Sequence, residues 1–221
     1  MTALDITLHA ASLRALPSGG LHWPDQGLLV VSDLHLGKSE RLARRGGSLL
    51  PPYETGETLA KLDADLDATG AARVICLGDS FDDLQAADAL AEKHRLWLAR
   101  MMAGRDWTWI EGNHDAGPVE IGGTHRAEWS LGPLTFRHIA QAGARGTERG
   151  EVSGHFHPKA RIGGRARACF LMDRDRLILP AYGHYTGGLD CADAALQALM
   201  GPEARVILIG PRAIMAPMPR G

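Results

Sequence analysis

Residues 28–33 read LLVVSD, and residues 73–79 read RVICLGD. Each run is short, apolar and rich in β-branched residues, and each ends at an aspartate, which is typical of a buried strand followed by a loop. Between them Pro51-Pro52 interrupts the chain, and a helical pattern up to Gly70 then follows from the spacing of Leu59, Leu62 and Leu66. This stretch therefore predicts a strand–helix–strand unit.

A second helix and a third strand are expected next along the chain. Asp82 or Asp83 is a candidate N-cap for the helix, and Gly104 can end it. The run WTWIEGNHD at 107–115 predicts a strand that leads into a loop. Such alternation favours an α/β architecture with reactive groups at the carboxyl ends of strands. The apolar positions of the second helix are Leu84, Leu90, Leu98 and Met101.

The second half of the chain is different in character, because short strand candidates separated by glycine-rich turns replace the helical pattern from about Trp129 onward. A helical pattern returns only around residues 192–200. The length of 221 residues, without an internal repeat or a low-complexity linker, favours one domain over residues 1–221. The strand candidates are LTFRH (134–138), EVSGH (151–155), RARACFLM (165–172), RLILP (176–180) and RVILIG (205–210).

Composition indicates an ordinary soluble protein. The formal charge is -2 at pH 7, from 24 basic and 26 acidic residues, so any contact with nucleic acid would have to be local. The first residues lack the apolar core of a secretory signal, and no apolar run is long enough to span a membrane. Cys76, Cys169 and Cys191 are widely separated and read as buried thiols in a reducing compartment. A cytoplasmic location is therefore expected.

Potential metal ligands follow the strand candidates. Imidazole, carboxylate and amide oxygen together suit manganese, iron or zinc better than a thiolate site or an all-oxygen calcium site would. Each motif alone is a weak signal, but their ordered succession after apolar runs is a strong one. The motifs are Asp33-Leu34-His35, Gly78-Asp79, Gly112-Asn113-His114-Asp115, His138, and Gly154-His155-Phe156-His157.

The motifs DLH, GDSFD, GNHD and GHFH, in this order, resemble the signature of the calcineurin-like metallophosphoesterases. More narrowly, the flanking stretches DLHLGKSERLARRG, LPP, GHFHP, RACFL and LPAYGHYTGGLD resemble the DNA-ligase-associated metallophosphoesterases, a bacterial branch of DNA-repair endonucleases or phosphodiesterases. The resemblance implies a four-layer α-β-β-α sandwich of two mixed β-sheets flanked by helices. It also implies DNA as the substrate and a functional association with a DNA ligase and a helicase.

The resemblance further implies two divalent metal ions, of which manganese is the first expectation and iron or zinc the alternatives. Asp79 would serve both ions, and a shared anionic ligand offsets the repulsion between two close dications. The other ligands would be Asp33, His35 and His157 for the first ion, and Asn113, His138 and His155 for the second.

Two residues are expected to act on the proton chemistry. By resemblance His114 stays off the metals, contacts the phosphate and protonates the leaving oxygen, and Asp115 orients its imidazole. Asp115 could instead brace a turn. Asp82 could join the site as part of GDSFD, but capping of the following helix is the simpler interpretation.

Basic residues just beyond the first motif are candidates for contact with substrate phosphates, although a solvated helix face is an equally good interpretation. The expected function is hydrolysis of phosphodiester bonds by a DNA endonuclease or phosphodiesterase. A small-molecule phosphatase or nucleotide pyrophosphatase is the alternative. A non-catalytic scaffold is disfavoured because no expected ligand is missing. The basic candidates are Lys38, Arg41, Arg44 and Arg45.

Overall fold

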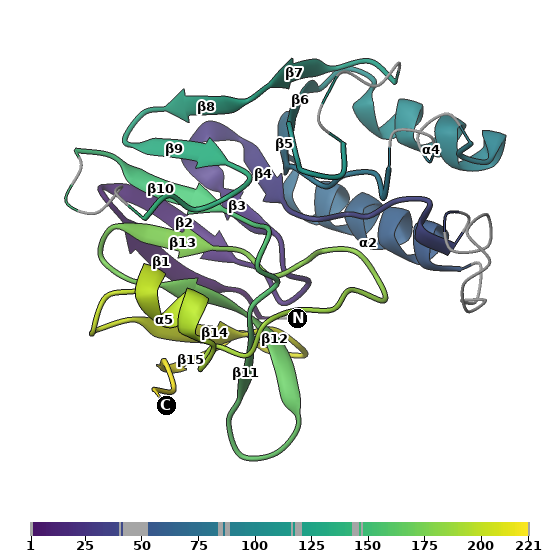
Figure 1. Cartoon of the computed structure of the whole chain (residues 1–221). Helices are drawn as coiled ribbons and strands as arrows, with labels where there is room; N and C mark the ends of the chain where they lie inside the picture. Colours follow the sequence, from purple (N-terminus) through teal and green to yellow (C-terminus); the bar gives the residue numbers. More distant parts are fainter. Residues whose placement is uncertain are drawn as a thin grey trace.

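The computed structural model describes residues 2–39, 41, 53–83, 86, 89–115, 117, 121–142, 146 and 148–220. Two mixed β-sheets face each other, and helices cover their outer faces (Figure 1). Helices α2 (Glu54–Thr69) and α4 (Glu92–Met102) lie on the first sheet, and α5 (Ala194–Leu199) lies on the second. The four-layer sandwich expected from the sequence is confirmed.

The first sheet changes from antiparallel to parallel along its width. Strands β1 to β4 pair antiparallel, and β4 to β7 pair parallel. The carboxyl ends of β4, β5 and β6 therefore lie at one edge of the sheet. The strands, in spatial order, are β1 (Leu4–Leu8), β2 (Ala11–Ala15), β3 (Leu21–Trp23), β4 (Leu28–Val31), β5 (Arg73–Leu77), β6 (Asp106–Ile110) and β7 (Thr124–Arg126), with the short 3-10 helix η1 (Pro24–Gln26) between β3 and β4.

The second sheet is also mixed, because β9, β10 and β13 run parallel while the remaining pairs are antiparallel. β11 pairs with β12 beside the main path. The strands, in spatial order, are β15 (Ile214–Pro217), β14 (Arg205–Leu208), β12 (Ala166–Met172), β13 (Arg176–Ile178), β10 (Gly150–Ser153), β9 (Leu134–Arg137) and β8 (Glu128–Leu131), and β11 covers Lys159–Arg161.

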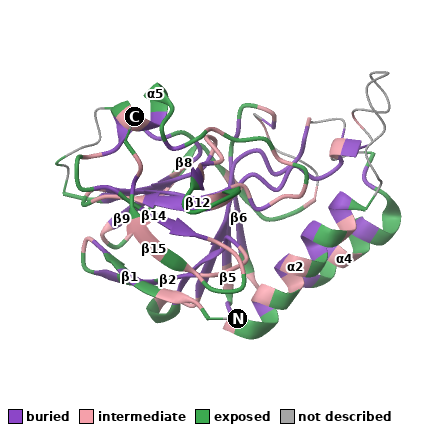
Figure 2. Cartoon of the chain, turned by 90° about the horizontal axis from the view of Figure 1, so that it is seen from below, coloured by how far each residue is buried: buried purple, intermediate pink, exposed green. Residues whose placement is uncertain are grey.

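Three apolar layers hold this sandwich together. Side chains alternate across a strand, so Val30 of β4 packs between the sheets whereas Leu29 and Val31 pack toward α2 and α4. On the second sheet Cys169 and Leu171 face α5. Figure 2 shows the buried residues along the strands and the exposed residues on the outside. The central strands are therefore covered on both faces, which explains why they are continuously apolar in sequence.

The helix predicted up to Gly70 is confirmed as α2. Gly70 has a φ of 62°, and its N–H donates to the Leu66 carbonyl at 2.9 Å, which ends the helix. Of the second predicted helix, the structure describes α4, which begins at Glu92. Asp83 Oδ1 accepts from Ala86 N at 2.6 Å, the contact expected of an N-cap residue, and Leu84 lies outside the described residues.

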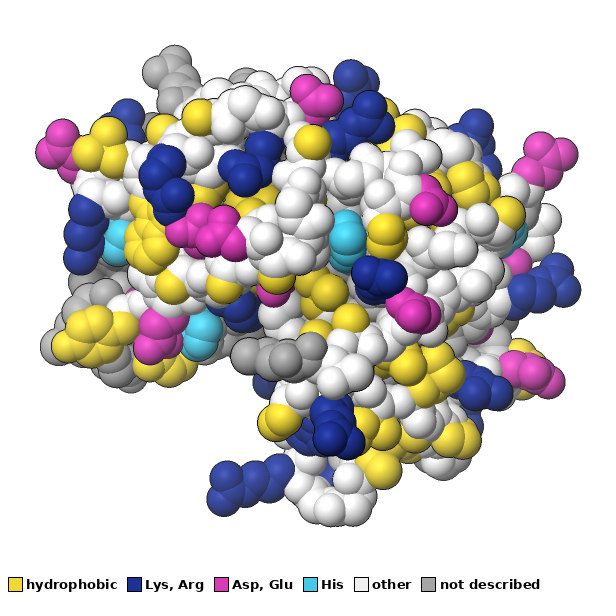
Figure 3. Space-filling view, turned by 180° about the vertical axis from the view of Figure 1, so that it is seen from behind, with side chains coloured by type: hydrophobic (Ala, Val, Ile, Leu, Met, Phe, Trp, Pro, Cys, Tyr) yellow, Lys and Arg dark blue, Asp and Glu magenta, His cyan; other side chains and the backbone are white. Residues whose placement is uncertain are grey.

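Two further predictions concern the environment of the chain. Cys76, Cys169 and Cys191 are all buried and unpaired, as expected. Within the described ranges no helix has both the length and the apolar character needed to cross a membrane. On the face shown in Figure 3, basic and acidic side chains are interspersed, in keeping with the small net charge.

Candidate metal centre

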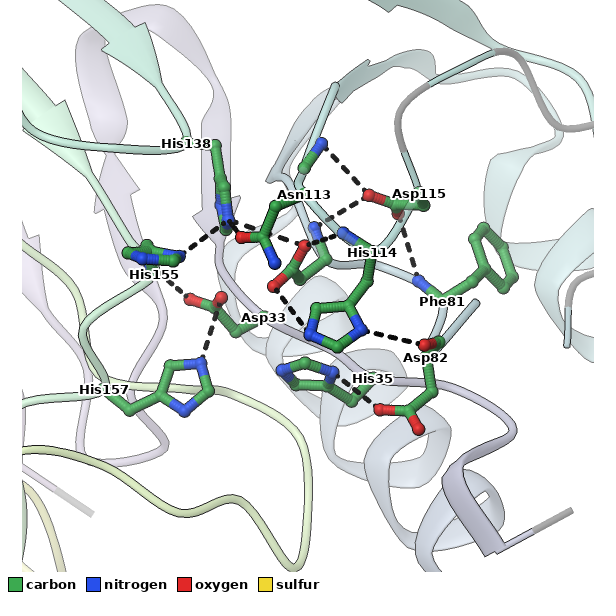
Figure 4. Close-up of polar contacts among 12 residues, drawn as sticks. Asp33, His35, Phe81, Asp82, Asn113, His114, Asp115, His138, His155 and His157 are labelled. Carbon is green, nitrogen blue, oxygen red and sulfur yellow. Dashed lines mark hydrogen bonds and ion pairs between the residues drawn. The ribbon is translucent and has the colours of Figure 1, made fainter. Parts of the chain in front are cut away.

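The predicted ligands meet where the carboxyl ends of parallel strands from both sheets converge (Figure 4). The loops after β4, β5 and β6 bring residues from the first sheet, and the loops after β9 and β10 bring residues from the second. Ligand atoms form two clusters, and within each cluster they lie within 4.8 Å of one another. The first cluster is Asp33, His35 and His157, and the second is Asp79, His138 and His155.

The backbone is unusual at most of these positions. Positive φ angles are rare for residues with a side chain and cost roughly 1–3 kcal/mol each. The loops must therefore be held by their surroundings, and His35 N donates to Asp79 O at 2.9 Å. The φ angles are 53° at Asp33, 46° at His35, 46° at Asp79, 72° at His155 and 46° at His157.

Glycine permits the close approach of two of these loops. A Cβ atom added to Gly154 would lie 1.7 Å from Ser32 Oγ, and one added to Gly112 would lie 2.1 Å from Asp79 N. Neither distance is possible between non-bonded atoms. The glycines of the GHFH and GNHD motifs are therefore required for packing of the ligand loops.

Asp33 is held with one carboxylate oxygen toward the cluster. Its Oδ2 accepts from Ser32 Oγ at 2.5 Å and from His155 N at 3.0 Å, whereas Oδ1 lies 3.0 Å from His157 Nε2. Burial opposes ionisation, but the contacts with His157 outweigh it and hold the pKa of Asp33 below its usual value. Asp33 is therefore a carboxylate with one oxygen left for an ion.

His35 is oriented by Asp82. His35 Nδ1 donates to Asp82 Oδ1 at 2.9 Å, and Arg41 Nε donates to Asp82 Oδ2. Although burial opposes ionisation, His35 and Arg41 hold the pKa of Asp82 below its usual value. The alternative interpretation from sequence, that Asp82 joins the site, is therefore confirmed, and the residues that Asp82 would cap lie outside the described residues. With Nδ1 held by Asp82, Nε2 is the ring nitrogen of His35 that is directed into the site.

The ligand atoms of the first cluster are arranged as they would be around a bound cation. Asp33 Oδ1, His35 Nε2 and His157 Nε2 are all buried; Asp33 Oδ1 lies 3.0 Å from His157 Nε2, and His35 Nε2 has no hydrogen-bond partner among the described residues. Buried polar atoms are normally satisfied, and a proton between Asp33 and His157 would still leave His35 Nε2 unpaired. A divalent cation satisfies all three, so these residues fit the metal that the sequence implies.

In the second cluster the donor atoms contact one another. His138 Nδ1 donates to Leu77 O at 2.9 Å, which turns Nε2 toward the cluster. That Nε2 lies 3.0 Å from Asn113 Oδ1, 3.2 Å from His155 Nδ1 and 3.5 Å from Asp79 Oδ1. The structure thus brings all seven predicted ligands into the two clusters, with Asn113 joining the second.

Charge in the second cluster is shared between its members. Burial opposes ionisation of Asp79, but the hydrogen bond and charge of His138 hold its pKa well below the usual value. Burial lowers the pKa of His138, but the carboxylates of Asp79 and Asp33 outweigh it and raise the pKa above 6.5. Burial and the charge of His138 lower the pKa of His155. A proton on His138 therefore occupies the position that suits a cation.

His114 lies beside the second cluster without belonging to it. Its main-chain N donates to Asp79 Oδ1 at 2.9 Å, and its ring Nδ1 donates to the Asp82 carbonyl at 3.0 Å. The other ring nitrogen, Nε2, is 4.0 Å from Asp79 Oδ2. The side chain is 35% exposed, so a bound substrate can reach it.

The structure corrects the expectation that Asp115 orients His114. Burial raises the pKa of Asp115 although several main-chain donors oppose this effect. The acceptor that orients the ring of His114 is instead the Asp82 main-chain carbonyl. Asp115 braces the turn that carries Asp79, which was the alternative from sequence. Its carboxylate accepts from the main-chain N–H groups of Asp79, Ser80, Phe81 and Gly112 at 2.7–3.1 Å.

Of the four basic candidates, two lie near Asp82 and two lie outside the described residues. Arg41 is paired with Asp82, and the charge of Lys38 contributes to the lowered pKa of Asp82. Arg44 and Arg45 lie outside the described residues. Ser32, which holds Asp33, was not identified from sequence, and its only signal is its position beside a ligand.

Comparison with known proteins gives one informative relative. No protein-family model and no curated protein matches the chain. A solved structure of the Pseudomonas putida nuclease MPE superposes with a TM-score of 0.78 at 29% sequence identity, over 97% of this chain and 100% of that one. The Escherichia coli phosphoesterase YfcE has 14% identity and a TM-score of 0.39, over 87% of this chain and 99% of that one, which is too weak to inform the site.

Fold and site together define a metallophosphoesterase, and the resemblance inferred from the DLH, GDSFD, GNHD and GHFH motifs is confirmed. The prediction of a metal-dependent hydrolase of phosphate esters is confirmed as well. Within that class, the informative solved relative is the nuclease from Pseudomonas putida.

Proposed function

We propose that the chain is a two-metal phosphodiesterase that cleaves DNA internally, in the setting of DNA repair. The main support is the pair of adjoining imidazole–carboxylate clusters on a fold that superposes on a nuclease over nearly its whole length. A second support is the branch resemblance of the flanking sequences.

The first ion would be held by Asp33, His35 and His157, and the second by Asn113, His138 and His155, with Asp79 shared between them. When bound, two divalent ions hold the phosphate oxygens and lower the pKa of a water molecule so that it becomes a nucleophile near neutral pH. Manganese, iron and zinc are the candidates, because this donor set accepts several first-row ions, and the resemblance of the flanking sequences puts manganese first.

His114 would supply the proton. Donation from Nδ1 to the Asp82 carbonyl fixes the ring, so that Nε2 is the nitrogen available to the substrate. When protonated, Nε2 can donate to the departing oxygen, and an alkoxide leaves poorly without such a donor. The arrangement suits an internal diester, whose leaving group is an ordinary sugar alkoxide.

The test is a panel of three substrates with Mn²⁺: bis-p-nitrophenyl phosphate, p-nitrophenyl phosphate and a covalently closed single-stranded DNA circle. Linearisation of the circle, with turnover of the diester, is the expected result, because a circle has no end for an exonuclease. The Asp79→Ala protein, purified in parallel, controls for contaminating nuclease. Turnover of the monoester alone would overturn the proposal in favour of a small-molecule phosphatase.

A further inference from the structure

A pocket of about 440 Å³ opens beside the second cluster. Asn113 and His138, two members of that cluster, form part of its wall. The rest of the wall includes Glu128, Arg137 and Ile139. The volume lies in the range of small-ligand sites, and the pocket borders the second cluster through Asn113 and His138.

Arg137 gives this wall an unusual electrostatic character. Its Nη2 lies 3.0 Å from Glu128 Oε2, and its Nη1 lies 3.5 Å from Glu151 Oε1, whereas its Nε is buried and has no hydrogen-bond partner in the described part of the chain. Glu151 is shared with Arg176, which is fully buried. Two guanidinium groups thus face one buried carboxylate, and the compensating Glu128 is 55% exposed.

Because Glu128 is exposed, another anion can replace it as the partner of Arg137. The exposed Glu128 carboxylate can return to solvent, so an incoming anion can replace it on Arg137, whose side chain is 16% exposed. A phosphate diester matches the fork of a guanidinium well. The carboxylates of Glu111 and Glu128 disfavour further phosphates in the same pocket, so it would take one phosphate only.

Ile139 supplies the apolar part of the wall. It follows the ligand His138 in sequence and is 43% exposed, so its side chain is accessible to a bound molecule. A pocket with one guanidinium, one apolar surface and carboxylates able to accept hydrogen bonds suits a nucleotide, with its phosphate, its ring surface and its amino or hydroxyl groups.

We propose that this pocket binds the nucleotide that neighbours the scissile phosphodiester, with its own phosphate replacing Glu128 on Arg137 and its base or sugar against Ile139. The inference rests on the proposed function, because a small diester has no neighbouring phosphate. It names a binding determinant that separates polynucleotides from small phosphate esters.

The two partners of the ion pair should respond in opposite directions, which is the test. The measured quantity is the ratio of kcat/KM for a single-stranded oligonucleotide to kcat/KM for bis-p-nitrophenyl phosphate, because this ratio cancels differences in active fraction. Arg137→Gln should lower the ratio about tenfold, and Glu128→Gln should raise it about threefold. Arg14→Gln serves as the control, since Arg14 pairs with Asp5 on β1 and β2, at the opposite edge of the first sheet, and should leave the ratio unchanged.

Changes of the same sign in both variants, or no change in either, would overturn the inference, because an ion pair with a merely structural role loses stability from either side. If Arg137→Gln does not fold, the exposed Glu128→Gln variant decides alone: a rise supports the pocket, and an unchanged or lower ratio overturns it. Failure of the wild-type protein to cleave any oligonucleotide, with intact turnover of the small diester, would instead overturn the proposed function itself.

Discussion

The two clusters of the metal centre hold their ligand side chains in place in different ways. In the first cluster other side chains fix the ligands, Ser32 holding Asp33 and Asp82 holding His35, and His35 Nε2 has no hydrogen-bond partner among the described residues. In the second cluster a main-chain carbonyl fixes His138, and the donor atoms of Asn113, His138 and His155 contact one another.

This difference indicates which cluster depends more on a bound cation to satisfy its buried polar atoms. In the first cluster His35 Nε2 has no partner among the described residues unless a cation binds, whereas in the second cluster a proton on His138 can be shared with Asn113 and Asp79. We therefore expect the first cluster to bind its ion more tightly, and the second ion to compete with a proton.

The largest effect is expected from Asp79→Ala, which tests whether the halves share a ligand. Loss of a shared carboxylate should lower the content of bound metal from about two ions per chain to fewer than about one, and activity more than ~10²-fold. Elemental analysis of the purified protein and the diester assay measure both. Retention of one full ion would place Asp79 in the second cluster alone.

His114→Ala should be the next largest, and it separates chemistry from metal binding. Because the ring donates to Asp82 O and belongs to neither cluster, both ions should remain while kcat falls by ~10²–10⁴-fold. The same elemental analysis provides the control. If this variant loses metal, the division between ligands and proton donor is incorrect.

Asp82→Ala should affect one half of the centre only. Without the carboxylate that orients His35, affinity for the first ion should fall ~10–100-fold, whereas the second should change little. Titration with Mn²⁺, followed by calorimetry, measures the affinity for each of the two ions. Asp83→Ala is the matched control, because that neighbouring carboxylate caps a local turn. Equal weakening of both ions would remove the distinction between the clusters.

The smallest effect concerns pH. Asp79 and Asp33 raise the pKa of His138, so at pH values near and below this raised pKa an ion must displace a proton from Nε2. Affinity for the second ion should therefore fall as the pH drops through the raised pKa, by at most ~10-fold per pH unit for one proton. Calorimetry in two buffers of different ionisation enthalpy counts that proton. If binding of the second ion releases no proton, the assignment of this proton to His138 is wrong.

Sequence patterns predicted the elements that carry the ligands. β4 and β5 are buried on both faces, so their apolar runs are continuous, and each ends just before a ligand, Asp33 or Asp79. The strands β1 (Leu4–Leu8) and β2 (Ala11–Ala15) were not predicted. Their buried residues alternate with exposed ones, which leaves a weaker apolar signal than that of a central strand.

The residues that orient the ligands were harder to predict from the sequence. Asp82 and His35 are 47 residues apart, and their contact depends on how the loops after β4 and β5 pack. The same is true of Asp115, whose carboxylate accepts from main-chain groups about 35 residues earlier in the chain. Spacing identifies which side chains have ligand chemistry, but it does not show which neighbours orient them.

Both clusters contain ligands from each of the two sheets, for example Asp33 with His157 and Asp79 with His138. Each bound ion would therefore connect one sheet directly to the other. Separation of the sheets during unfolding would have to release both ions, so the melting temperature should depend on the concentration of free metal. The catalytic centre would then also set how long the folded protein survives when metal is scarce.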